Sequence, residues 1–238
     1  MPYSHPQPLT REQALGRIHH LLPGALAFAG TAGFINSIAL GVFRSPVSHM
    51  TGAVSYLGID FAGGHARAAI ATLSIILAFM VGAGLAGLIV GAENLAPGRR
   101  YGAALCCEGG LLAAAMFLLV SGRSFGVSLI AMACGLQNAT TSSYCGLMIR
   151  TTHVTGTVTD IGVMLGHWLR HRQIERRKLL FMVGVVTAFG AGVWIGALAD
   201  GRWGSASLAI ASVGCMIAGG SIGLFPRWFT RTMRGGNA

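Results

Sequence analysis

The chain has 238 residues, of which 53% are hydrophobic and 10% charged, with a net charge of +10. Soluble domains carry about 25% charged residues, so this composition excludes an ordinary soluble fold and indicates an all-α integral membrane protein. The basic residues lie between apolar runs, which is the positive-inside pattern of a membrane protein and argues against nucleic-acid binding.

Six apolar runs are long enough to cross a bilayer, which takes about 20 residues. They are residues 21–43, 66–91, 101–120, 125–149, 179–199 and 203–225. The first run is too long for the core of a signal peptide, so we interpret it as a retained span after a polar cytoplasmic segment, residues 1–20.

Two further apolar segments, 51–61 and 155–169, are short and interrupted by polar residues. Ten helical residues rise about 15 Å, half of a bilayer core about 30 Å thick, so each segment could be a broken or re-entrant half-helix. Six spans then result, with both termini cytoplasmic and only Arg44, Arg67, Arg123 and Arg202 outside. Eight spans also satisfy the positive-inside rule, but segment length favours six.

A polar pattern occurs twice along the chain. Gly-Phe-Ile-Asn at 33–36 precedes Ser-His-Met-Thr-Gly at 48–52, and Gly-Leu-Gln-Asn at 135–138 precedes Thr-His-Val-Thr-Gly at 152–156. A Gly-Ala-Gly run at 82–84 matches a second one at 190–192. The pattern predicts two membrane repeats, residues 21–120 and 125–225, followed by a basic cytoplasmic tail, 226–238. Three spans per repeat would make the repeats inverted.

The paired pattern also indicates where a site would lie, because polar side chains are costly inside a bilayer unless they are held or used. The predicted substrate-binding residues are Asn36, His49, Thr51, Gly52, Asn138, His153, Thr155 and Gly156. Threonine is an acceptable N-cap, and a helix start near the midplane suits an anionic group. A capped turn before a surface helix, with interfacial histidines, is the alternative.

Two acidic residues are predicted proton carriers, Glu108 within a span and Asp160 within the second short segment. The alternative for Glu108 is a structural ion pair with a motif histidine or with Arg150. Asn36 and Asn138 have interhelical hydrogen bonding as their alternative role.

No metal or cofactor is expected. The five cysteines lie in apolar stretches without metal-ligand spacing and resemble buried small hydrophobes. His167 and His171 share a helix face, but Arg170 and Arg172 beside them favour a basic end at the membrane surface over a metal site.

The paired motifs resemble those of the YoaK-like family of bacterial inner-membrane proteins, a family classed as a domain of unknown function. The resemblance covers about residues 21–225 and implies a multi-pass protein of the bacterial inner membrane. Members of that family often carry aspartate where this chain has Asn36 and asparagine where it has Ala53. Because an amide cannot ionise, a charged role at position 36 is not available to this chain.

The sequence therefore favours a transporter or permease for a small polar or anionic solute, with the lipid bilayer as its surroundings. The site would lie between the two repeats, and one repeat would rock against the other. Assembly into a homo-oligomer is compatible with the glycine-rich spans. An intramembrane enzyme that uses His49 or His153 as a base, and a non-catalytic membrane scaffold, are the alternatives.

Overall fold

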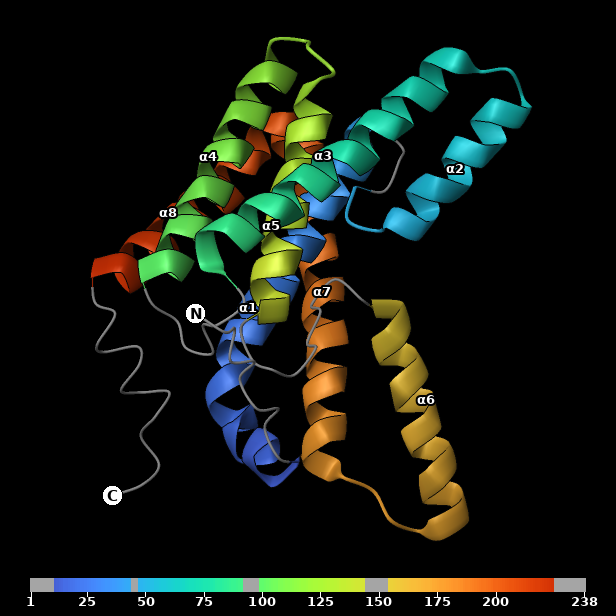
Figure 1. The fold of residues 1–238 in the computed structure, drawn as a ribbon, viewed down its shortest axis with the longest axis vertical. Helices are drawn as coiled ribbons and strands as arrows, with labels where there is room; N and C mark the ends of the chain where they lie inside the picture. Colours follow the sequence, from blue (N-terminus) through green and yellow to red (C-terminus); the bar gives the residue numbers. More distant parts are fainter. Residues whose placement is uncertain (1–10, 44–46, 92–98, 144–153, 225–238) are drawn as a thin grey trace, which may run out of the picture.

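The computed structural model describes residues 11–43, 47–91, 99–143 and 154–224, and these residues form helices without any strand (Figure 1). The helices are α1 (Arg11–Phe43), α2 (Met50–Ala62), α3 (Ala66–Val90), α4 (Arg99–Val120), α5 (Gly126–Ser143), α6 (Val154–His171), α7 (Arg176–Trp203) and α8 (Leu208–Leu224), with the 3-10 turn η1 (Gly204–Ser207) before α8. The predicted all-α class is confirmed.

Each predicted segment corresponds to one helix, although several ends differ. The first helix begins earlier than the predicted span, at Arg11, and α7 continues past the predicted end to Trp203. Within the described residues, four helical stretches are long and apolar enough to cross a bilayer. They are Leu22–Val42, Ala66–Val90, Arg99–Val120 and Arg176–Leu224, the last of which contains both α7 and α8.

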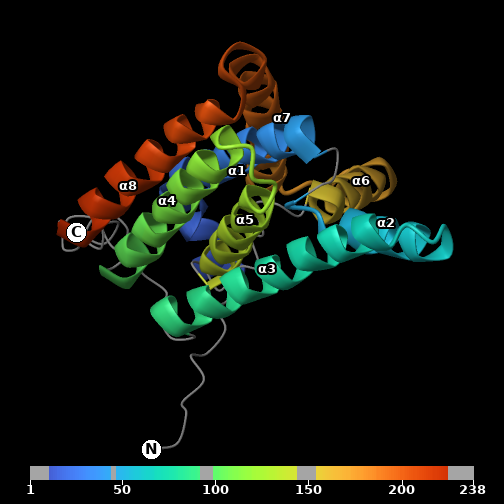
Figure 2. The same ribbon diagram turned by 90° about the horizontal axis from the view of Figure 1, so that it is seen from above.

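Three closely packed helix pairs form the body of the protein: α1 with α7, α3 with α5, and α4 with α8. Each pair takes one helix from the first half of the chain and one from the second, so the halves interleave. Figure 2 shows α1 and α5 at the centre, with α2 and α6 together at one edge. In addition, α4 packs extensively against α5, whereas α8 touches α1 only lightly.

Glycines allow the backbones of α1 and α7 to touch. A Cβ atom on Gly33 would overlap the carbonyl oxygen of Phe189, and a Cβ atom on Gly192 would overlap that of Gly30. Further along both helices, Gly196 packs against Phe34. Because later residues of α1 meet later residues of α7, the two helices run parallel.

The α3–α5 pair is built in the same way. A Cβ atom on Gly135 would overlap the carbonyl oxygen of Phe79, and one on Gly82 would overlap that of Met132. These helices are also parallel, because Ser74 and Ser128 approach within 3.1 Å through their hydroxyl oxygens one to two turns earlier in each.

The α4–α8 pair runs antiparallel. Gly102 and Gly219 lie against each other's carbonyl oxygens, each 2.6 Å from the position that a Cβ atom would take. Gly109 lies against the carbonyl oxygen of Ser212, at 2.8 Å from such a position. Small residues at these contacts are what helix packing within a bilayer requires.

Large apolar side chains cover the outer faces of the described helices. Leu88, Phe117 and Leu180 are among the most exposed, and they come from α3, α4 and α7. Monomeric soluble proteins rarely expose extended apolar surface, so this exterior fits contact with lipid.

Candidate functional site

A hydrogen-bonded chain of polar side chains joins α1 to the start of α2. Asn36 in α1 is buried, and its Oδ1 accepts a 2.8 Å hydrogen bond from Ser48 Oγ. The same hydroxyl oxygen lies 2.8 Å from His49 Nδ1. Because the only hydroxyl proton of Ser48 is donated to Asn36, the Nδ1–H of His49 must be the donor.

His49 also connects this chain to α7. Its ring meets the ring of Phe189 edge to face, with centroids 5.6 Å apart and planes at 83°. Phe189 is the residue against which Gly33 packs, so the histidine lies beside the α1–α7 crossing. We call the group formed by Asn36, Ser48 and His49 the polar relay.

The predicted N-cap role of Thr51 is wrong. Helix α2 begins at Met50 with His49 as its N-cap, and no side chain caps it. The reason is that the carbonyl oxygen of His49 already accepts hydrogen bonds from the amides of Gly52 and Ala53, at 3.1 and 3.3 Å. Thr51 lies exposed in the first turn, while Gly52 is half-buried.

The second copy of the pattern is described from Val154 onward, and His153 lies outside the described residues. Because α6 begins at Val154, Thr155 lies inside the helix and the predicted cap is wrong here too. Thr155 and Gly156 are exposed. The carbonyl oxygen of Thr155 accepts a hydrogen bond from Thr159 Oγ1 at 2.9 Å.

The first turns of α2 and α6 have the same local structure, because Ser55 Oγ likewise donates to the carbonyl oxygen of Thr51 at 2.9 Å. Figure 1 places both helix starts near the mid-height of the bundle, on the same side. From there α2 runs upward and α6 runs downward.

Helix α5 contributes a second buried polar region. Gln137 is 1% exposed and donates from Nε2 to the carbonyl oxygen of Phe28 in α1, at 3.5 Å. Gln137 Oε1 and Thr140 Oγ1 are buried, with no hydrogen-bond partner among the described residues. Asn138 is half-buried, and its carbonyl oxygen accepts from Thr141 Oγ1 at 3.0 Å.

Glu108 lies deep in the protein, on α4, with 1% of its surface exposed. Its carboxyl group lies close to the thiol of Cys215 in α8, and Cys134 of α5 is near enough to interact with it electrostatically. Oε1 has no partner among the described residues. No described histidine is its partner, and Arg150 and His153 lie outside the described residues.

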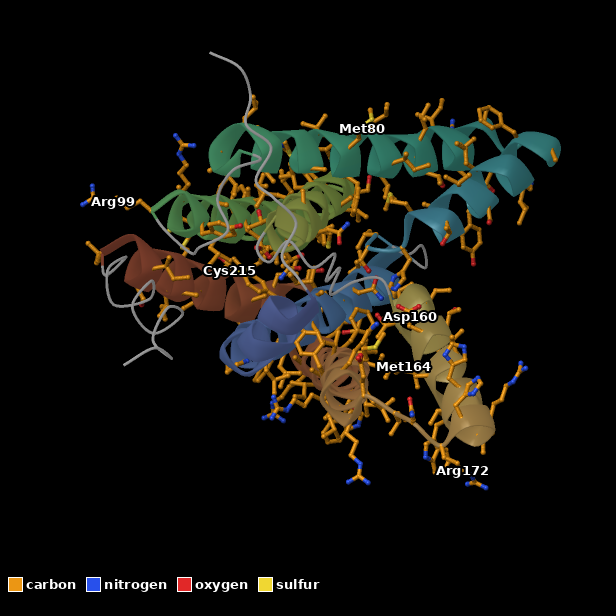
Figure 3. All side chains as sticks on the ribbon, turned by 60° about the horizontal axis from the view of Figure 1, so that its bottom comes forward. Met80, Arg99, Asp160, Met164, Arg172 and Cys215 are labelled. Carbon is orange, nitrogen blue, oxygen red and sulfur yellow. The ribbon has the colours of Figure 1, made fainter. Side chains whose placement is uncertain are left out.

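Asp160 occupies a different environment. It is exposed on α6 and lines a groove at the α6–α7 junction together with Met164, His167 and Lys178. Figure 3 shows Asp160 and Cys215 on opposite sides of α1. The two predicted proton carriers therefore do not lie together.

In the described part of the chain, no group of three histidine, cysteine or acidic side chains is placed to hold a metal ion, and the four described cysteines are free. Sequence reasoning missed Ser48, Phe189 and Cys215 as members of the site regions. For Ser48 a signal existed, because a hydroxyl residue precedes the histidine in both copies of the pattern.

The fold and the site together define a helical membrane protein with glycine-packed helices and two helices, α2 and α6, that start near its mid-height. The chain belongs to the DUF1275 family, described as proteins of unknown function, which it matches over residues 24–221. No curated protein and no solved structure matches the chain. The predicted membership of an uncharacterised domain family is confirmed, and the YoaK-like name stays a prediction.

Proposed function

We propose that this protein is a small-solute transporter of the bacterial inner membrane, with six spans, cytoplasmic termini and a site between two inverted repeats. The observation that carries the proposal is the polar relay at the start of α2, with α6 also starting near the mid-height of the bundle and running the opposite way. Broken helices near the midplane of inverted repeats are where many transporters hold their substrates.

The directions of the paired helices support six crossings. If α2 and α6 do not cross, α1 and α7 run the same way, as do α3 and α5, while α4 and α8 run oppositely. All three relations agree with the observed pairs. Eight crossings would make α4 and α8 parallel, in conflict with the contacts of Gly102 with Gly219 and of Gly109 with Ser212.

The glycine contacts also support an internal repeat. The α1–α7 contacts of Gly33 and Gly192 have counterparts in the α5–α3 contacts of Gly135 and Gly82. Gly30 and Gly33 of α1 precede their counterparts in α5, Met132 and Gly135, by 102 positions. Phe79 and Gly82 of α3 precede their counterparts in α7, Phe189 and Gly192, by 110 positions. Two contacts per pair with the same two offsets favour a common origin over coincidence.

The α4–α8 pair has the same property. With an offset of 110 positions, Gly109 of α4 corresponds to Gly219 of α8, and Gly102 of α4 corresponds to Ser212 of α8. The contact between Gly102 and Gly219 is therefore the counterpart of the contact between Gly109 and Ser212. A twofold axis in the membrane plane would relate the two contacts, as inverted repeats require.

The polar relay can bind a polar solute through the side chains of His49 and Asn36. The first-turn amides of α2 favour a negatively charged group on that solute, because a helix start carries partial positive charge. Polar or anionic metabolites are therefore the solutes that we expect.

Uptake into proteoliposomes tests the proposal. The purified protein is reconstituted, supplied with a mixture of small polar and anionic metabolites, and the vesicle contents are identified by mass spectrometry. We expect His49→Ala to abolish uptake. His65→Ala is the matched control, because His65 is an exposed histidine that lies 4.0 Å from Asp60 at the α2–α3 turn.

Two results would count against transport. The first is uptake per folded molecule that stays unchanged in His49→Ala while only its abundance or stability falls, which would make the relay structural. The second is a chemically altered metabolite, which would favour an intramembrane enzyme.

A further inference from the structure

The carboxyl group of Glu108 lies at the centre of the α4–α8 crossing. Glu108 is adjacent in sequence to Gly109, whose carbonyl oxygen accepts a 2.8 Å hydrogen bond from Ser212 Oγ. Cys215, whose thiol lies close to the carboxyl group, is on α8 between the two glycine contacts that define the crossing, those of Ser212 and Gly219. If the repeats are related by a twofold axis, the axis passes through this crossing.

The side chains that face this carboxyl group are thiols. Cys215 comes from α8, Cys134 from α5, and Cys107 is the neighbouring residue on α4 itself. No basic side chain among the described residues compensates the carboxylate. Burial of an unpaired carboxylate is costly, so this packed arrangement fits the protonated acid.

The packing around Glu108 is not equal on its two sides. Under the proposed repeat, the α4–α5 interface and the α8–α1 interface are counterparts, yet the first is extensive and the second slight. A transporter with inverted repeats alternates between two states by exchanging such unequal interfaces. The exchanged state would open the α4–α5 interface, which is the one that covers Glu108.

We propose that Glu108 is the proton-carrying group that couples solute movement to the proton gradient. This inference rests on the proposed transport function. With α4 packed on α5 the carboxyl group keeps its proton and is sealed. When the two helices separate, its O–H bond breaks, the proton passes to water and the carboxylate remains.

Carbodiimide labelling tests the proton site without any solute. Dicyclohexylcarbodiimide reacts with protonated carboxyl groups in apolar surroundings, and peptide mass spectrometry locates the adduct. We expect the adduct on Glu108 in membranes, its loss in Glu108→Gln, and its persistence in Asp160→Asn. An adduct that is absent from Glu108, or that depends on Asp160 instead, overturns the inference.

Solute accumulation tests the coupling. For one proton moved with each solute, each pH unit across the membrane changes the accumulation ratio by about tenfold. Glu108→Gln copies the shape of the protonated acid, so we expect it to fold, to exchange solute and to lose this pH dependence. Glu108→Asp keeps an ionisable group and should retain part of the pH dependence of accumulation.

The two proposals fail in distinguishable ways. Uptake that ignores the pH gradient and is unchanged in Glu108→Gln refutes proton coupling and leaves transport standing. Labelling of Glu108 with no uptake of any metabolite in the wild-type protein refutes transport, and with it the coupling, while the reactive buried acid remains.

Discussion

Alanine substitutions at four glycines test the helix packing. Sequence similarity aligns the Gly-Ala-Gly runs, so that Gly82 corresponds to Gly190. The packing instead makes Gly82 the counterpart of Gly192, because both would push a Cβ atom into the carbonyl group of a facing helix. Around Gly84 and Gly190 there is open space. We expect Gly82→Ala and Gly192→Ala to destabilise the protein, and Gly84→Ala and Gly190→Ala to be tolerated.

The magnitude follows from comparing matched variants. Replacing glycine by alanine inside a helix gains about 1 kcal/mol in helix propensity, and this gain is common to all four variants. The difference between Gly192→Ala and Gly190→Ala is then the cost of overpacking, about 1–3 kcal/mol. At Gly192 the new methyl group meets the backbone of Gly30, including its Cα atom at 3.0 Å, so no side-chain rotation can relieve the contact.

Thermal unfolding in detergent measures this difference. A dye that becomes fluorescent on reaction with thiols reports unfolding, because Cys134 and Cys215 are buried in the folded protein. For a chain of this size, 1 kcal/mol shifts Tm by about 2–4 °C, so a separation of about 2–12 °C is expected. Equal Tm values for Gly192→Ala and Gly190→Ala, or a lower value for Gly190→Ala, would refute the packing.

Two further predictions concern the polar relay and the topology. Ser48→Ala removes the hydrogen-bond donor to the buried Asn36, so it should lower the free energy of unfolding by about 1–3 kcal/mol. Ser55→Ala, on the exposed face of α2, is the control and should change this free energy by under about 0.5 kcal/mol. Chemical denaturation measures both values. For the topology, single cysteines are placed at positions 62 and 122 of a cysteine-free variant and treated with membrane-impermeant maleimide. Both should react from outside the cell if there are six spans, and from inside if there are eight. A cysteine at position 172 is inside in both cases and serves as the control.

The helices themselves follow from the sequence, because an apolar run of about 20 residues has few alternatives in a bilayer. The two short segments were also predictable, since Thr51 and Asp60 bound an apolar stretch too short to cross. Helix starts were less predictable. His49, not Thr51, caps α2, because the carbonyl oxygen that accepts the first helical bonds is set by tertiary packing.

The partner of Glu108 could not be predicted from the sequence. A buried acid suggests a basic partner, yet the described contact is the thiol of Cys215, more than a hundred positions later. Nothing in the local pattern distinguishes Cys215 from a cysteine that only fills space. The correspondence of Gly82 with Gly192 is also hidden in the sequence. Alignment of the two identical Gly-Ala-Gly runs pairs Gly82 with Gly190, whereas the packing depends on which small residue faces the backbone of the neighbouring helix.

The interleaved helices change which parts of the protein can move against each other. Backbone contacts at Gly33 and Gly192 lock α1 to α7, so a helix from the first half moves with one from the second. For the proposed transport, this packing favours the helix pairs, and not the two sequence halves, as the units that would shift. His49 touches Phe189 at the α1–α7 crossing, and so a solute bound at the polar relay would contact this pair directly. Glu108 lies instead on the α4–α8 pair, where a change in the α4–α5 interface would reach it. Coupling between solute binding and the proton on Glu108 would then be carried by the interfaces among the helix pairs. Helix α5 contacts both α1 and α4, so it is the element that connects the polar relay to Glu108.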